Sequence, residues 1–216
     1  MSTTYLDVVN KVLRRLREPE VSTVNETDYS ALIGDFVNDV KVEVENSWDW
    51  SALRNTLTID TAASIFNYEF SDSNVRMRVL DAYNDTDDAM LIQKPGAWFD
   101  QQFMNYDAAV EGSPRYFNFN GTSADGTIAV DIYPIPDGVY TLRFNVALPM
   151  VELTSDADVI YLPVDLLVSG AVSRAMEERG IDGGNQSAEM RYRLLLADYI
   201  AIDAAKREDE ISWSVV

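Results

Sequence analysis

The sequence predicts an α+β protein: a four-helix bundle, formed by an N-terminal and a C-terminal helix pair, carries an inserted antiparallel β-sandwich or barrel-like domain. Apolar residues recur at helical spacing over the first fifty residues and again from residue 162 onward. Between these regions, short alternating runs are separated by polar turns, which is typical of strands. We therefore expect a discontinuous helical domain (1–52 and 160–207), a β domain (53–159) and a C-terminal tail (208–216).

The N-terminal pair has clear helix signals. Thr4 and Asp7 have the spacing of a capping box, and Pro19 ends the first helix. Its apolar face contains Tyr5, Val9, Val12, Leu13 and Leu16. Asp28 is expected to cap the second helix. The apolar stripe of that helix contains Ile33, Val37, Val40, Val44 and Trp48.

From Leu53 the apolar period changes from 3.6 to two, so a β region begins there. One short helix is expected after Pro95, where aromatic residues recur at helical spacing. The expected strands are residues 53–60, 65–70, 75–83, 90–93, 116–119, 127–133 and 139–148. Short strands at this spacing favour a sandwich or a partly closed barrel.

The C-terminal pair begins near Leu162, and Gly180 is expected to end its first helix. Gly170 lies inside that helix, where it costs about 1 kcal/mol relative to Ala, which indicates close contact with another helix. The expected apolar face is Leu166, Leu167, Ala171 and Ala175. Asn185 is expected to cap the last helix. The apolar stripe expected to be buried in the bundle is Met190, Leu194, Ala197, Ala201 and Ala204, with Leu195, Tyr199 and Ile202 beside it.

Composition restricts the chemistry. The 216 residues include no Cys and no His, which removes disulfides, thiolate metal sites and the usual general base. The formal net charge of −19 repels nucleic-acid phosphate. No apolar run is long enough to span a bilayer, and the first residues lack the order of a signal peptide. We therefore expect no cofactor, no metal ion and no membrane contact.

Two groups of side chains are candidate contact sites. Trp48 and Trp50 flank the helix-to-strand junction, where we expect them to fill a hinge between the domains; a sugar-stacking platform is the alternative. The only basic cluster consists of Lys11, Arg14, Arg15 and Arg17. It is either a solvated face or a contact to acidic surface on a partner.

The C-terminal tail is a third candidate. Trp213, Val215 and Val216 follow the acidic run Glu208-Asp209-Glu210. Such a segment either frays or becomes ordered on a partner. We expect the second, with the tail docking on another protein or an adjacent subunit.

Several stretches carry a resemblance to a known family: Tyr5–Arg17, the helix Tyr29–Trp48 leading through Ser47-Trp48-Asp49-Trp50 into Leu57-Thr58-Ile59, and Leu162-Pro163. The arrangement resembles the head-to-tail adaptor (connector) proteins of tailed bacteriophages, most closely the tail tubular protein A type of short-tailed phages. The resemblance implies a structural virion protein and no enzyme. It implies a homo-oligomeric ring of about twelve copies between the portal protein and the tail nozzle protein.

The resemblance also implies roles for the ring. It extends the DNA channel, helps to retain the packaged genome and takes part in genome ejection. DNA passes through the lumen without specific binding, because an acidic wall repels phosphate. The expected portal or subunit contacts are Lys11, Arg14, Arg15, Arg17, Trp213, Val215 and Val216. The expected location is the neck or tail of the virion, after assembly in the host cytoplasm.

Two other functions remain open from the residues alone. One is a carbohydrate- or receptor-binding β-sandwich module of a virion. The other is an acidic glycosidase, which needs two carboxylates with different pKa values. Asp156 with Asp158, or Asp131 with Asp137, would be the pairs, but no flanking feature raises the pKa of either partner.

Overall fold

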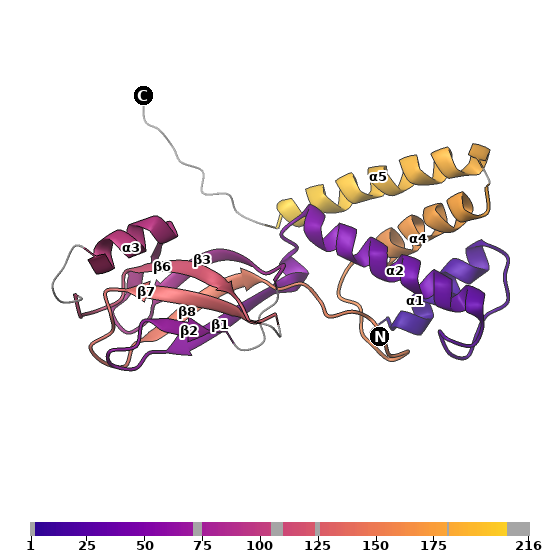
Figure 1. Cartoon of the computed structure of the whole chain (residues 1–216). Helices are drawn as coiled ribbons and strands as arrows, with labels where there is room; N and C mark the ends of the chain where they lie inside the picture. Colours follow the sequence, from indigo (N-terminus) through magenta and orange to yellow (C-terminus); the bar gives the residue numbers. More distant parts are fainter. Residues whose placement is uncertain (1–2, 71–74, 105–109, 124–125, 181, 207–216) are drawn as a thin grey trace, which may run out of the picture. The chain divides into compact units, whose positions relative to one another are not determined.

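The computed structural model describes residues 3–70, 75–104, 110–123, 126–180 and 182–206. Within them the chain has five α-helices and two four-stranded sheets, so the predicted α+β class is confirmed (Figure 1). The chain divides into two compact units. Met1–Ala52 and Met150–Val216 form the helical unit, and Leu53–Pro149 forms the β unit. The second boundary lies ten residues before the predicted one, because residues 150–160 bind to the helices.

Threonine side chains cap the first two helices. α1 spans Tyr5–Arg15, and the predicted capping box is confirmed: the Asp7 N–H donates to the Thr4 hydroxyl, and the Thr4 N–H donates to the Asp7 carboxylate. α2 spans Asp28–Ser47. Its cap is Thr27 and not the predicted Asp28, because Thr27 has the extended backbone of a cap and its hydroxyl accepts the N–H of Ser30 at 3.0 Å.

α4 (Val164–Glu178) is the central helix of its unit, in contact with α1, α2 and α5. A Cβ atom on Gly170 would lie 2.6 Å from Cγ1 of Val40 on α2 and 3.0 Å from the ring of Tyr192 on α5. The predicted close helix contact at Gly170 is therefore confirmed. The predicted apolar faces of α2 and α4 are buried at Ile33, Val37, Val40, Val44, Leu166, Leu167, Ala171 and Ala175. Trp48, the last residue of the predicted α2 stripe, instead follows the helix as its C-cap and is half-buried.

α5 spans Asp182–Ala204, so Asn185 lies inside the helix and does not cap it. The face predicted to be buried is wrong. Met190 and Leu194 are 66% and 62% exposed. The opposite side, which includes the buried Tyr192 and Asp203, packs in the helical unit. The reason is that α5 has apolar residues on two opposite faces, and their spacing alone does not identify the face that packs against the other helices.

An extended segment brings the chain back to the helical unit along α2. The side chain of Lys41 is buried, and its Nζ donates to the carbonyls of Met150 at 3.1 Å and Val151 at 2.7 Å. Glu45, one helical turn further on, is also buried. It accepts the N–H of Met150 at 3.0 Å and lies 3.7 Å from Lys41 Nζ. The buried ion pair therefore binds the backbone of the returning chain.

The same segment continues across both N-terminal helices. The side-chain amide of Asn38 donates to the Leu153 carbonyl at 2.9 Å and accepts the Leu153 N–H at 3.0 Å. The Tyr5 N–H, at the start of α1, donates to the Asp158 carbonyl at 2.9 Å. Because each contact uses backbone groups, the two ends of the sequence are joined independently of most side chains in residues 150–160.

Two sheets make up the β unit. The first has the order β1-β8-β3-β4 with antiparallel pairing: β1 (Arg54–Asp60), β8 (Thr141–Ala147), β3 (Arg78–Asn84) and β4 (Ala89–Met90). The second has the order β2-β7-β6-β5: β2 (Asn67–Glu69), β7 (Ile128–Tyr133), β6 (Tyr116–Thr122) and β5 (Ile92–Gln93). The β5–β6 pair is parallel, so the expectation of purely antiparallel pairing is wrong there.

The expected strand 90–93 is divided between the two sheets. Leu91 is buried between β4 and β5, and its N–H donates to the Ala82 carbonyl on β3 at 2.8 Å. The next residue, Ile92, instead donates to the Arg115 carbonyl beside β6 at 2.9 Å. The chain therefore crosses from one sheet to the other at Leu91, which a pattern of alternating residues does not reveal.

Aromatic rings fill the core that the two sheets share. The Phe144 ring on β8 lies 4.8 Å from that of Phe70 and 5.4 Å from that of Phe117, between centroids. Other core residues are Ile59, Ala82, Leu91, Ile128, Val130, Ile132, Leu142 and Val146. Helix α3 (Gly96–Met104) contacts β6, and the ring of its half-buried Trp98 lies 4.8 Å from that of Tyr116.

The β unit begins and ends on neighbouring strands. A short 3-10 helix (Ser51–Leu53) leads into β1, where Arg54 pairs with Ala147 of β8. The Leu148 N–H donates to the Leu53 carbonyl at 2.9 Å. The two connections to the helical unit therefore leave the β unit side by side.

We expect Lys41→Met to lower the free energy of unfolding by about 3 kcal/mol, because Glu45 would remain buried without its cation. Urea unfolding followed by tryptophan fluorescence measures the change. The control is the double variant Lys41→Met, Glu45→Met, which has no uncompensated charge and should recover part of the loss. A Lys41→Met variant as stable as the parent would contradict the role assigned to this pair.

Gly170→Ala should destabilise the protein by about 1–3 kcal/mol, although Ala normally favours a helix interior. The new Cβ would overlap Val40, whose branched side chain has few alternative rotamers. In a Val40→Ala background the overlap with Val40 is removed and only the close contact with the Tyr192 ring at 3.0 Å remains, so the same substitution should cost clearly less. The four proteins are compared by urea unfolding, and an equal loss in both backgrounds would rule out this contact as the cause.

Candidate interaction surfaces

The basic cluster lies on one side of α1. Arg14 and Arg15 are exposed and Lys11 is half-buried, while Arg17 follows the helix with a left-handed backbone (φ 61°). Arg14 forms an exposed ion pair with Glu20 at 3.1 Å, which contributes less than about 1 kcal/mol. The other three cations form no ion pair with any residue that the structure describes. They are available to an acidic partner.

Arg15 also lines a cavity of about 550 Å³ formed by α1, α4 and α5. Arg191 of α5 lines the same cavity, and the remaining lining is Ser169, Val172, Met176, Ser187 and Ala188. Two arginines beside a partly apolar lining suit an acidic segment with apolar side chains. The sequence analysis missed Arg191, because no local pattern links it to a cluster at the other end of the chain.

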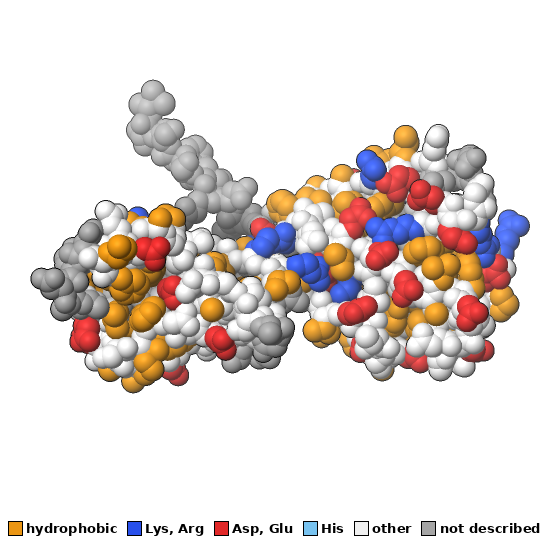
Figure 2. Space-filling view, in the orientation of Figure 1, with side chains coloured by type: hydrophobic (Ala, Val, Ile, Leu, Met, Phe, Trp, Pro, Cys, Tyr) orange, Lys and Arg blue, Asp and Glu red, His pale blue; other side chains and the backbone are white. Residues whose placement is uncertain are grey.

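Charge is mixed over the helical unit. Figure 2 shows Lys and Arg side chains of this unit interspersed with Asp and Glu side chains. Arg174 of α4, for example, binds Asp39 and Glu43 of α2 at 3.3 and 2.8 Å. The contact role predicted for the basic cluster stays a prediction. The other predicted contact residues, Trp213, Val215 and Val216, lie outside the described residues.

Both tryptophans of the junction bind groups of the helical unit. Trp50 is buried, and its indole N–H donates at 2.7 Å to the Val44 carbonyl in the last turn of α2. Trp48 is half-buried, and its indole N–H donates at 3.2 Å to the carboxylate of Asp203 on α5. The predicted hinge role of the two rings stays a prediction. At the end of α2, the Trp50 indole takes the Val44 carbonyl as its acceptor, and the Trp48 indole takes the Asp203 carboxylate.

Asp203 is the residue that the sequence analysis missed at this junction. Besides the Trp48 indole, its carboxylate accepts the Ser51 N–H at 2.9 Å and the Ser51 hydroxyl. Burial acts to raise the pKa of Asp203, but hydrogen bonds from Ser51 and Lys206 outweigh it and hold the pKa below its ordinary value. The charged carboxylate thus fixes the chain next to the point where it leaves the helical unit.

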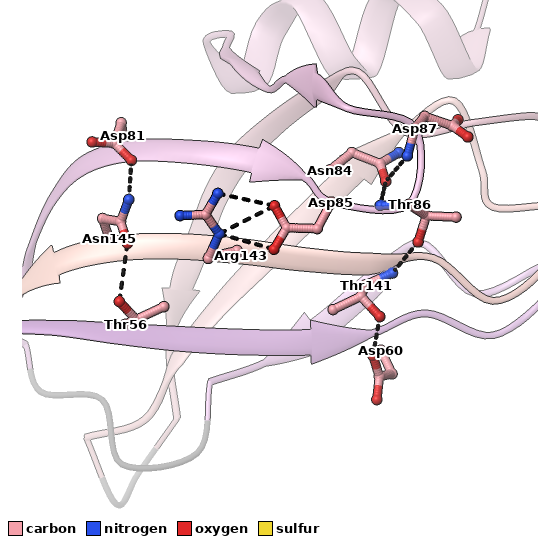
Figure 3. Close-up of polar contacts among 10 residues, drawn as sticks. All are labelled: Thr56, Asp60, Asp81, Asn84, Asp85, Thr86, Asp87, Thr141, Arg143 and Asn145. Carbon is pink, nitrogen blue, oxygen red and sulfur yellow. Dashed lines mark hydrogen bonds and ion pairs between the residues drawn. The ribbon is translucent and has the colours of Figure 1, made fainter.

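On the β1-β8-β3 sheet, the face away from the core carries polar side chains that bind one another (Figure 3). Arg143 donates to both carboxylate oxygens of Asp85 at 2.9–3.1 Å, and its guanidinium lies 5.1 Å from the ring of Tyr83. Asn145 donates to Asp81. Arg143 therefore covers the Tyr83 ring on this face of the sheet.

The carboxylates considered for a glycosidase bind local groups. Asp158 accepts the N–H groups of Ser155 and Thr154, both at 2.8 Å, and these bonds hold its pKa below the ordinary value. Asp156 accepts the Val24 N–H at 2.9 Å. A general acid needs the opposite, a raised carboxyl pKa. This pair therefore stabilises a loop.

The second pair has side-chain donors. Asp131 accepts the Asn67 amide at 2.6 Å, and Asp137 accepts the hydroxyl of Tyr140, whose pKa this bond raises to about 12. In the part of the chain that the structure describes, no three acidic residues group closely enough to hold a metal ion. No helix in that part is both long and apolar enough to cross a membrane.

Comparison with known families decides the assignment. The model of the family described as SU10 adaptor protein matches residues 3–215. The chain belongs to the SU10 adaptor protein family. The match spans both units and confirms the resemblance to phage head-to-tail adaptors, a family of structural proteins. No curated protein matches the adaptor sequence.

Asp203→Asn should lower the free energy of unfolding of the adaptor by about 1–2 kcal/mol at pH 7, because four hydrogen bonds, from Trp48, Ser51 (two) and Lys206, lose their charged acceptor. A carboxyl with a depressed folded pKa stabilises above its unfolded pKa, about 3.9, and loses this effect as the pH falls through the folded value. The difference between parent and variant should therefore shrink below pH 4. Urea unfolding between pH 7 and pH 3 measures it. Asp198→Asn, at an exposed position of α5, is the control, and an equal effect of both substitutions would contradict the assignment.

Proposed function

We propose that this adaptor forms a ring of about twelve copies between the portal protein and the tail nozzle, and that the ring extends the DNA channel and helps to retain the packaged genome. Membership of the adaptor family across residues 3–215 is the observation that carries the proposal. The helical unit, acting as a four-helix bundle, and the β unit, acting as a sandwich, would then form one wedge of the ring.

The charges support assembly with acidic surfaces. Lys11, Arg15 and Arg17 have no ion-pair partner among the described residues, in a chain whose formal net charge is −19. Exposed cations next to many carboxylates favour contact with the acidic face of another copy or of the portal. We propose that the basic cluster forms the portal or subunit contact together with the C-terminal tail. The residues of this contact are Lys11, Arg14, Arg15, Arg17, Trp213, Val215 and Val216.

The net charge also supports passage of DNA. Carboxylates that line a channel repel phosphate, so the double helix moves through without binding to the wall. The effect extends over about one Debye length, roughly 8 Å at physiological salt. Such a ring would be part of the neck or tail of the virion, assembled in the host cytoplasm.

The assembly test uses the purified adaptor and the portal protein of the same phage. Electron microscopy of the mixture should show rings of adaptor on the portal. Adaptor that remains unbound at micromolar concentration would contradict the proposal. Adaptor that instead binds immobilised glycans would favour the carbohydrate- or receptor-binding alternative.

Charge reversal tests the basic cluster. Arg15→Glu should weaken portal binding at least tenfold, because it places a carboxylate against an acidic surface. Arg115→Glu is the matched control, since Arg115 is an exposed arginine of the β unit that forms no ion pair with a described residue.

Deletion of residues 208–216 should abolish portal binding and leave the circular dichroism spectrum unchanged. Equal binding by all variants would assign the contact to other surfaces.

A further inference from the structure

α5 has an apolar stripe that no described residue of the helical unit covers. Met190 and Leu194 are 66% and 62% exposed, and Ala197 and Ala201, which continue the same helix face, are exposed as well. Figure 2 shows hydrophobic side chains along the edge of the helical unit where Figure 1 places α5. Large apolar side chains gathered on one helix face mark an interaction surface more often than isolated ones do.

The spacing of the stripe is that of a helix-pairing seam. Met190, Leu194, Ala197 and Ala201 follow each other at intervals of four, three and four residues, the alternation of a and d positions in a heptad. The side of α5 that packs in the helical unit, with the buried Tyr192 and Asp203, lies on the far side of this seam. A second helix can therefore pack on the seam without displacing α4.

Large and small side chains occupy opposite ends of the seam, so the seam is complementary to a second, antiparallel copy of itself. The two large residues, Met190 and Leu194, come first, and the two small ones, Ala197 and Ala201, follow. When two α5 helices run antiparallel, Leu194 of each copy faces Ala197 of the other, and Met190 faces Ala201. Large then packs on small at all four positions, which fills the seam and allows the helices to approach closely.

The charges beside the seam show the same symmetry. Arg191 and Asp198 are exposed on one flank of the stripe, seven residues apart, and neither forms an ion pair with a described residue. In the antiparallel alignment Arg191 of each copy lies next to Asp198 of the other, so two opposite-charge pairs form. A second, antiparallel α5 therefore covers the apolar seam and also pairs the charges beside it.

We propose that two copies of this chain pair through antiparallel α5 helices. The contact uses the same surface on both copies and has two-fold symmetry, so it cannot be the contact between neighbours in a cyclic ring. It therefore belongs to the adaptor outside the ring, where it covers the apolar stripe, and it goes beyond the proposed function. One helix pair covers less than the roughly 800 Å² per partner of a standard stable interface, so the pairing is reversible.

Sedimentation equilibrium of the full chain tests the pairing. Between micromolar and several hundred micromolar protein, the average mass should rise from that of one chain towards that of two. Arg191→Asp and Asp198→Arg should each weaken the association roughly tenfold, because each places like charges together twice. The double variant, and an equimolar mixture of the two single variants, should restore it. A parent protein that stays single at every concentration, or a charge exchange that restores nothing, would overturn the proposal.

Cysteine cross-linking tests the geometry, since the chain has no native cysteine. Under oxidation the double variant Leu194→Cys, Ala197→Cys should form covalent pairs and no longer products, because a two-fold contact closes on itself. Asn46→Cys, at an exposed position of α2, is the control and should give little product. A ladder of longer products would show a head-to-tail contact and refute antiparallel pairing.

Discussion

The fold of the helical unit depends on one buried ion pair. Lys41 and Glu45 lie in the interior, where charged groups are stable only if their hydrogen bonds are satisfied. They meet this requirement by binding the carbonyls of Met150 and Val151 and the N–H of Met150. The pair thus holds the chain at the position where it returns from the β unit. Further along the same segment, Asn38 of α2 binds Leu153 and the start of α1 binds Asp158, so the ion pair is the first of several links between the N-terminal helices and the chain that leads into α4.

The returning segment explains why an insertion of about a hundred residues is compatible with a compact helical unit. Closing a long loop costs conformational entropy, and this cost grows only slowly with loop length. The β unit reduces it further, because Arg54 and Ala147 pair on adjacent strands and bring the two connections together. Asp203 holds the outgoing connection through Ser51, and Lys41 holds the incoming one. Each connection thus has its own anchor in the helical unit.

The sequence predicted the elements whose signals are local and missed those that depend on distant partners. The capping box at Thr4 follows from residues three positions apart, and the contact at Gly170 follows from a glycine inside a helix. The buried state of Lys41 could not be inferred, because a lysine on a helix looks solvated until the chain that covers it is known. The face of α5 was wrong for a similar reason, since its two apolar sides differ only in what packs on them. Arg191 lines the cavity beside Arg15 only because the fold brings α5 next to α1, which no local sequence pattern indicates.

Because β1 and β8 are neighbouring strands, the β unit is joined to the rest of the chain through two ends that lie close together. Its junctions near residues 53 and 149 place little demand on what lies between them, provided that the replacement has closely spaced ends. Recombination between phages could therefore exchange this unit for an unrelated domain while the helical scaffold stays intact.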